Sequence, residues 1–121
     1  MSFRRILTNL VERAKGARGA VFCDHEGESV ELVQRDPQLS EYELKIAGAQ
    51  LAAVWLYLQE SSSQSGIGPV QELQVSCSSG SLICRSLPDG YYVVLLIGPG
   101  APMAPAGFEL RATAAEIAAA L

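Results

Sequence analysis

Residues 41–60 read EYELKIAGAQLAAVWLYLQE, and this stretch decides how the rest of the chain can be arranged. Ser40 comes just before it and Glu43 three residues later, a pairing typical of a capping box. We therefore expect a helix from about Glu41 to Glu60. Placed at 100° per residue, its apolar side chains form two stripes on opposite sides. A helix on the surface of a monomer needs only one such stripe.

The two stripes differ in the bulk of their side chains. The first has alanines at its centre and consists of Tyr42, Ile46, Ala49, Ala53, Leu56 and Tyr57. The second is bulkier and consists of Leu44, Ala47, Leu51, Val54, Trp55 and Leu58. Bulky side chains cover a sheet well, and small ones let two helices approach closely. We expect the second stripe to lie on the sheet and the first to meet a second copy. The alternative is that a loop or the C-terminal helix covers the extra stripe.

The segments before this helix predict a helix and a β-hairpin. From Phe3 to Ala14, apolar residues recur at helical spacing on one face and charged residues fill the other, and Ser2 can cap the start of this helix. An apolar strand over residues 18–23 then reaches a turn at residues 24–27. In the second strand, residues 28–35, the alternation places Val30 and Leu32 on one face and Ser29, Glu31 and Val33 on the other.

The segments after the middle helix predict three strands and a last helix. The polar residues 61–65 indicate a mobile loop. Val70–Ser78 alternates, and residues 82–87 form the next strand. Tyr91–Ile97 is apolar without alternation, so we expect it at the centre of the sheet, covered on both faces. The alanine-rich run from Phe108 to Leu121 favours a helix.

The order α-β-β-α-β-β-β-α indicates an α/β fold of the layered α+β kind. We expect a five-stranded antiparallel sheet with one helix on one face and two on the other. Its 121 residues suit a single domain over residues 1–121. The alternating strand Val70–Ser78 has the character of a free edge that can pair with its own copy. We therefore add Glu72, Gln74 and Ser76 to the expected interface.

Charge and cysteine content exclude several classes of function. The chain has 9 basic and 13 acidic residues, a net charge of -4, and its only adjacent basic pair is Arg4-Arg5. This balance disfavours binding to nucleic acid or to anionic membranes. The N-terminus shows no apolar run of signal-peptide type, so we expect a cytoplasmic protein. Three cysteines, an odd number, argue against a disulfide framework.

The residues that might carry chemistry do not form a recognisable site. His25 would need an adjacent nucleophile, and the nearest, Cys23, comes two positions earlier. With Cys77 and Cys84 these residues supply four potential zinc ligands, but the latter two are seven apart, unlike the tight pairs of zinc sites. We interpret the three thiols as buried, reduced and inert. We expect no catalytic activity, no metal and no cofactor.

Several passages resemble the roadblock family, named for a dynein light chain. Residues 19–27, GAVFCDHEG, are similar to its first hairpin, and Ala47-Gly48 to a small-residue step in its middle helix. Residues 89–96, DGYYVVLL, resemble its turn and long apolar strand. Residues 108–112, FELRA, resemble the start of its last helix. The passages follow one another in the family's order, and the resemblance in the order and spacing of the elements covers nearly the whole chain.

The resemblance implies a homodimer or heterodimer made through the middle helix and the third strand. It also implies a platform for a small Ras-like GTPase, a GTPase regulator or a paralogous roadblock protein. Bacterial members act with a polarity-setting GTPase in gliding motility, and this sequence looks more like them than like the dynein subunits. Arg85 is the one basic residue of the fourth strand, and no arginine finger is obvious. Direct activation of hydrolysis and a scaffold role both stay open.

Two alternative functions are also consistent with the sequence. The first is a profilin- or longin-like ligand-sensing domain, which should enclose a cavity with convergent polar groups. The second is a dimeric adaptor without a GTPase partner.

Overall fold

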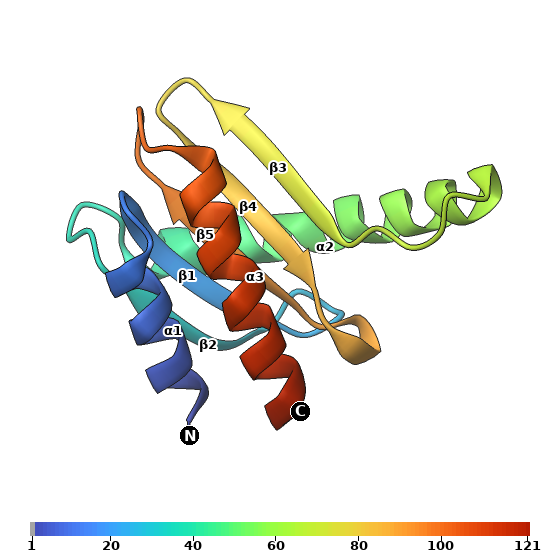
Figure 1. Ribbon diagram of the computed structural model, residues 1–121, viewed down its shortest axis with the longest axis horizontal. Helices are drawn as coiled ribbons and strands as arrows, with labels where there is room; N and C mark the ends of the chain where they lie inside the picture. Colours follow the sequence, from blue (N-terminus) through green and yellow to red (C-terminus); the bar gives the residue numbers. More distant parts are fainter. Residues whose placement is uncertain (1) are drawn as a thin grey trace.

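The computed structural model describes residues 2–121, and its elements follow the predicted order (Figure 1). The elements are α1 (Phe3–Arg13), β1 (Ala17–Cys23), β2 (Ser29–Gln34), α2 (Glu41–Ser65), β3 (Glu72–Cys77), β4 (Gly80–Ser86), the short 3₁₀ helix η1 (Pro88–Gly90), β5 (Tyr92–Ile97) and α3 (Met103–Ala120). This arrangement confirms the predicted fold class. Within the described residues, none of the helices combines the length and apolarity needed to cross a bilayer.

The sheet has the strand order β2-β1-β5-β4-β3, with antiparallel pairing between all neighbours. The prediction of a central β5 is confirmed, since β1 and β4 flank this strand. Val93, Val94 and Leu95 of β5 are fully buried. The sheet therefore separates two cores, one on each face.

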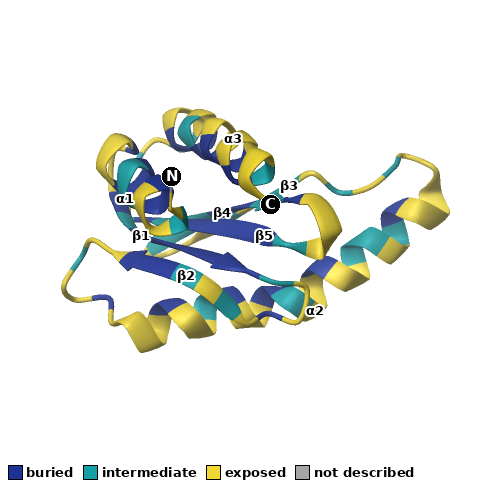
Figure 2. Ribbon diagram, turned by 90° about the horizontal axis from the view of Figure 1, so that it is seen from below, coloured by how far each residue is buried: buried dark blue, intermediate teal, exposed yellow. Residues whose placement is uncertain are grey.

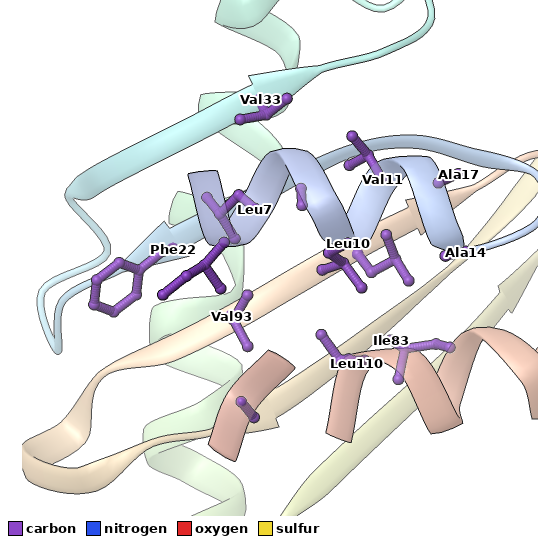
Figure 3. Packing of buried hydrophobic residues seen from close by; sticks show 14 of the residues in the cluster. Leu7, Leu10, Val11, Ala14, Ala17, Phe22, Val33, Ile83, Val93 and Leu110 are labelled. Atoms are coloured by element: carbon purple, nitrogen blue, oxygen red, sulfur yellow. The ribbon is translucent and has the colours of Figure 1, made fainter. Parts of the chain in front are cut away.

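Helices α1 and α3 cover one face and α2 crosses the other (Figure 2). Under α1 and α3, buried residues from both helices and from the sheet form one cluster (Figure 3). Its largest contributors include Leu7 and Leu10 of α1, Phe22 of β1 and Leu110 of α3, all exposed by 1% or less. The core under α2 contains Leu44 together with buried cysteine and tyrosine side chains of the neighbouring strands.

Helix α1 has the amphipathic form that the sequence predicts. The Ser2 hydroxyl accepts a hydrogen bond from the Arg5 amide at 3.2 Å and caps the helix. Gly16 adopts a φ of 81°, the left-handed conformation expected after the helix end. Its charged side chains all lie on the exposed face. Helix α1 therefore packs on the core through one face only.

Helix α2 is longer than predicted, and the expected mobile loop at residues 61–65 is wrong. The serines there are helical, and hydroxyls of Ser62 and Ser65 bond back to carbonyls of the preceding turn. Ser65 Oγ donates to the Ser61 carbonyl at 3.1 Å, and Ser62 Oγ to the Gln59 carbonyl at 3.1 Å. Gly66, with a φ of 75°, then ends the helix in the left-handed conformation. As a result, the last turns of α2 extend past the edge of the sheet (Figure 1).

Two other boundaries also differ from the sequence prediction. Helix α3 begins at Met103 instead of Phe108, because Pro105 falls in its first turn, where a backbone N–H has no helical partner to lose. In β2, Leu32 is buried under α2 as predicted, but Val30 is 46% exposed, and Val33, expected on the solvated face, is buried under the other two helices. Val33 is buried because helices cover both faces of the sheet. Val30 is the extra residue of a bulge, where the β1–β2 register shifts between Phe22 and Cys23.

Candidate interaction surface

The bulky stripe of α2 lies on the sheet, as predicted. Leu44, Leu51 and Trp55 are exposed by 0%, 7% and 6%. Ala47 and Leu58 are half-buried, whereas Val54 is 44% exposed, contrary to its expected place on the sheet. The inward face is therefore narrower than the pattern predicted.

Gly48 sets how closely α2 approaches the sheet. A Cβ at this position would lie 2.8 Å from Cys23 Sγ and 3.0 Å from a methyl group of Val21. The phenol of Tyr92 donates a hydrogen bond to the Gly48 carbonyl at 2.8 Å, deep in the core. Burial also raises the pKa of this phenol well above its usual value, so it remains a donor. The close approach explains why a small residue stands here.

The outward stripe of α2 is exposed along its whole length. Tyr42, Leu56 and Tyr57 are 72%, 62% and 68% exposed, and Ile46 is 38% exposed. Ala49 and Ala53 lie exposed between them. Between Lys45 and Glu60 the sequence has no charged residue. We call this surface the outer stripe; it consists of Tyr42, Ile46, Ala49, Ala53, Leu56 and Tyr57. Contiguous apolar surface of this kind marks interaction sites in folded proteins.

The predicted residues of β3 do not join the outer stripe. Glu72, Gln74 and Ser76 point to the face of the sheet that carries α3. Glu72 Oε1 lies 3.2 Å from Arg111 Nη1 of α3 and 3.5 Å from Arg85 Nη1 of β4. Within residues 2–121, β3 pairs with β4 alone, so its other backbone edge faces outward. The structure thus divides the predicted interface residues between two faces of the sheet.

Sequence reasoning missed a set of half-buried apolar residues beside α2. Leu73, Leu82 and Leu96 pack against the edge of the core under α2, and Val75 stands opposite Leu82 in the register. These side chains belong to β3, β4 and β5, where α2 no longer covers the sheet. The alternation of Leu73 and Val75 was the available signal for this surface. This half-buried apolar surface extends from α2 towards the free edge of β3.

The guanidinium of Arg85 is occupied within the chain. It shares the Glu72 carboxylate with Arg111, and its side chain is 26% exposed. An arginine that acts on a bound nucleotide must reach out of its own fold towards the partner. This ion pair holds Arg85 against the sheet instead.

The three thiols differ in exposure. Cys23 and Cys84 are buried as expected, but Cys77 is exposed, since it is the last residue of an edge strand. Burial raises the pKa of Cys23 to about 11 and that of Cys84 to about 12, which makes both poor nucleophiles. The His25 imidazole lies at the surface, 3.5 Å from a Glu26 carboxylate oxygen. Within residues 2–121, the structure does not gather three or more potential ligands into a metal site.

A groove of about 460 Å³ follows one flank of α2. Its walls come from α2, from the segment before β3 and from residues 86–92, with Trp55, Val70 and Tyr92 among them. The Gln59 amide on its wall is paired with the backbone of Val70 in both directions, at 2.8 and 3.0 Å. This is not the convergent, unpaired polar lining that the ligand-sensing reading requires.

No protein-family model and no curated protein sequence matches this chain. Solved structures do resemble it. Myxococcus xanthus MglB has a TM-score of 0.86 at 10% identity, covering 98% of this chain and 93% of that one. The roadblock/LC7 domain from Streptomyces avermitilis has a TM-score of 0.81 at 19% identity, covering 94% and 92%. MglC from Myxococcus xanthus has a TM-score of 0.73 at 25% identity, covering 100% of both chains.

Profilin also resembles the chain, at a lower score. Profilin II from Acanthamoeba castellanii gives a TM-score of 0.67 at 11% identity, covering 98% of both chains. The layered arrangement is therefore shared beyond one family. Among these structures the scores of 0.73 and above belong to roadblock and Mgl proteins, although a second roadblock/LC7 structure from Streptomyces avermitilis has a TM-score of 0.65.

Proposed function

We propose that this chain, which has the roadblock fold, is a non-catalytic dimeric regulator or scaffold in the cytoplasm that binds a small Ras-like GTPase or the complex regulating one. The resemblance read from the sequence is confirmed at the level of the fold by the MglB and roadblock/LC7 structures. The observation that carries the proposal is the outer stripe of α2, apolar and exposed, in a chain that also has a free edge at β3.

The outer stripe is the first half of the proposed dimer contact. Ala49 and Ala53 at its centre allow a second α2 helix to approach closely, and Tyr42 and Tyr57 contribute large apolar area around them. A two-fold axis makes such a contact self-complementary, because each copy supplies the same surface. A contact of this type buries on the order of 1,200–2,000 Å² in a stable dimer.

The edge of β3 is the second half. Antiparallel pairing of β3 with its copy satisfies the outward backbone groups and extends the five strands into one continuous sheet. The half-buried Leu73, Val75 and Leu82 then come under cover from the partner, whose α2 extends past its own sheet (Figure 1). Glu72, Gln74 and Ser76 line the same junction on the α3 face.

The GTPase partner is the finer part of the proposal. It is supported by the likeness to MglB and MglC. Glu72 engages the Arg85 guanidinium, which favours binding and bridging over the supply of this arginine to hydrolysis. A paralogous roadblock protein as heterodimer partner, or an adaptor role without a GTPase, would use the same surface.

Affinity capture with matched variants tests the proposal. The full chain is tagged and used as bait in lysate of its native cell, beside Ala53→Glu in the outer stripe and Arg5→Glu on the exposed face of α1. We expect the wild type and Arg5→Glu to capture a Ras-like GTPase or a paralogous roadblock protein, and Ala53→Glu to lose it. Identical preys for all three baits, or none of these proteins with any bait, would contradict the proposal.

A further inference from the structure

The groove lies on one flank of α2, beside the outer stripe of the proposed dimer contact. Ala52 lines it, whereas Val54, two residues later and about 200° around the helix, lies on the opposite flank. Leu56 borders both the groove and the outer stripe. A volume of about 460 Å³ falls in the range of sites that hold a small molecule or a bulky side chain.

The interior of the groove suits an apolar occupant. Gln59 is paired with Val70 through both atoms of its amide. The Tyr92 hydroxyl donates to the Gly48 carbonyl, and Ser86 Oγ donates to a main-chain carbonyl at 3.3 Å. A polar group entering the groove would therefore lose its water without gaining a partner from these side chains. A large aliphatic or aromatic side chain gains from burial against Trp55 and its neighbours instead.

Acidic residues predominate in the segments that line the groove, and we call their carboxylates its rim. Asp24, Glu26, Glu60 and Asp89 each stand next in sequence to a residue that lines it, and the last three are exposed. The nearest cation in sequence, Arg85, points to the opposite face of the sheet, where it pairs with a carboxylate of β3. The carboxylates therefore favour a partner with positive charges on either side of its apolar group.

We propose that this groove docks a segment of a partner protein that carries one bulky apolar side chain flanked by Lys or Arg. The interior selects the apolar side chain and the rim selects the flanking charge. Both parts come from a single chain, so the proposal does not rest on the dimer or on the GTPase.

The probe is a capped nonapeptide, Gly-Lys-Arg-Gly-Leu-Gly-Arg-Lys-Gly, titrated into the ¹⁵N-labelled full chain. We expect saturable shifts at the amides of Ala52, Gln59, Val70 and Tyr92. A change in the fluorescence of Trp55, the single tryptophan of the sequence, should follow the same curve. Replacing the central leucine by glycine should weaken binding about tenfold or more, since the buried side chain is lost. Replacing the four basic residues by glutamate should abolish it.

Two variants test the rim without touching the core. Glu60→Gln and Asp89→Asn each remove one exposed carboxylate, and we expect each to weaken peptide binding about two- to fivefold at low salt. Glu116→Gln, an exposed carboxylate on α3, is the matched control and should leave binding unchanged. Asparagine tolerates the positive φ of 61° at position 89, so the fold is kept.

Three results would overturn the docking proposal: no saturable shifts at groove residues, equal binding of the leucine and glycine peptides, or binding by Ala53→Glu but not by the wild type. The last result would mean that a second copy occupies the groove. Light scattering on the same samples reports the dimer separately, so failure of the groove and failure of the dimer are distinguished.

Discussion

Helices α1 and α2 pack on opposite faces of one sheet but present different surfaces to water. Each buries one apolar face: Ile6, Leu7, Leu10 and Val11 in α1, and Leu44, Leu51 and Trp55 in α2. Outward, α1 carries Arg4, Arg5, Glu12 and Arg13, whereas α2 carries the outer stripe. The buried faces of the two helices are alike, and only the outward faces differ. A charged outward face is stable in water, whereas an apolar one indicates a further contact.

The largest expected effect comes from mutations in the apolar face that each helix buries against the sheet. Leu10→Ala in α1 and Leu51→Ala in α2 each remove a buried side chain, so we expect each to cost about 2–5 kcal/mol of unfolding free energy. Urea unfolding followed by circular dichroism measures this, and the loss should appear at every protein concentration. If Leu51→Ala dissociated a dimer and left the stability of the fold intact, the two faces of α2 would be reversed.

A pair of helical glycines gives the next largest effect. Gly48→Ala in α2 places a methyl group 2.8 Å from Cys23 Sγ, and we expect a loss of about 1–3 kcal/mol from overpacking. Gly107→Ala in α3 is the control, because its methyl group meets the movable end of the Arg111 side chain at 3.2 Å. That variant should be neutral or gain up to about 1 kcal/mol from helix propensity. Equal losses in the two variants would remove the special role of Gly48.

The smallest expected effect is a pH dependence that α2 has and α1 lacks. The Glu43 carboxylate accepts a hydrogen bond from the Ser40 amide, which lowers its pKa below the usual 4.5. A depressed pKa stabilises the fold above the unfolded value, and this contribution is lost as the pH falls through the folded pKa. Ser2, which caps α1, does not titrate there.

Glu43→Gln should therefore show a slightly flatter stability profile than the wild type below about pH 4.5. Thermal unfolding of both proteins between pH 7 and pH 3 measures the difference. Asp36, whose pKa is lowered by the Gln38 amide and by Arg18, keeps its contribution in both and serves as the internal reference. Parallel profiles for the two proteins would show that the capping box has no role in acid stability.

The local sequence pattern was sufficient to predict how β5 and α2 are buried. The unbroken apolar run of β5 predicted a strand between two layers, and the two stripes of α2 predicted which one lies on the sheet. In both cases the side chains that pack together recur along a single element. The sequence alone could therefore predict the layers, the central place of β5 and most of the inward face of α2.

Features that depend on contacts far apart in sequence could not be predicted. Glu72 is separated from Arg111 by 39 positions, and only the folded sheet shows that it faces α3. The bulge at Val30 depends on the β1–β2 register, which alternation alone does not give. The groove beside α2 also exists only where distant segments meet. The outer stripe was visible in the sequence because it is local.

The most direct test of the central claim is the molar mass by light scattering across a micromolar dilution series, for the wild type, Ala53→Glu and Arg5→Glu. Our account predicts twice the chain mass for the wild type and for Arg5→Glu. Ala53→Glu should show the mass of one chain, with circular dichroism unchanged. A wild type at the mass of one chain throughout the series, or a folded Ala53→Glu that keeps twice that mass, would contradict the assignment of the outer stripe to a dimer.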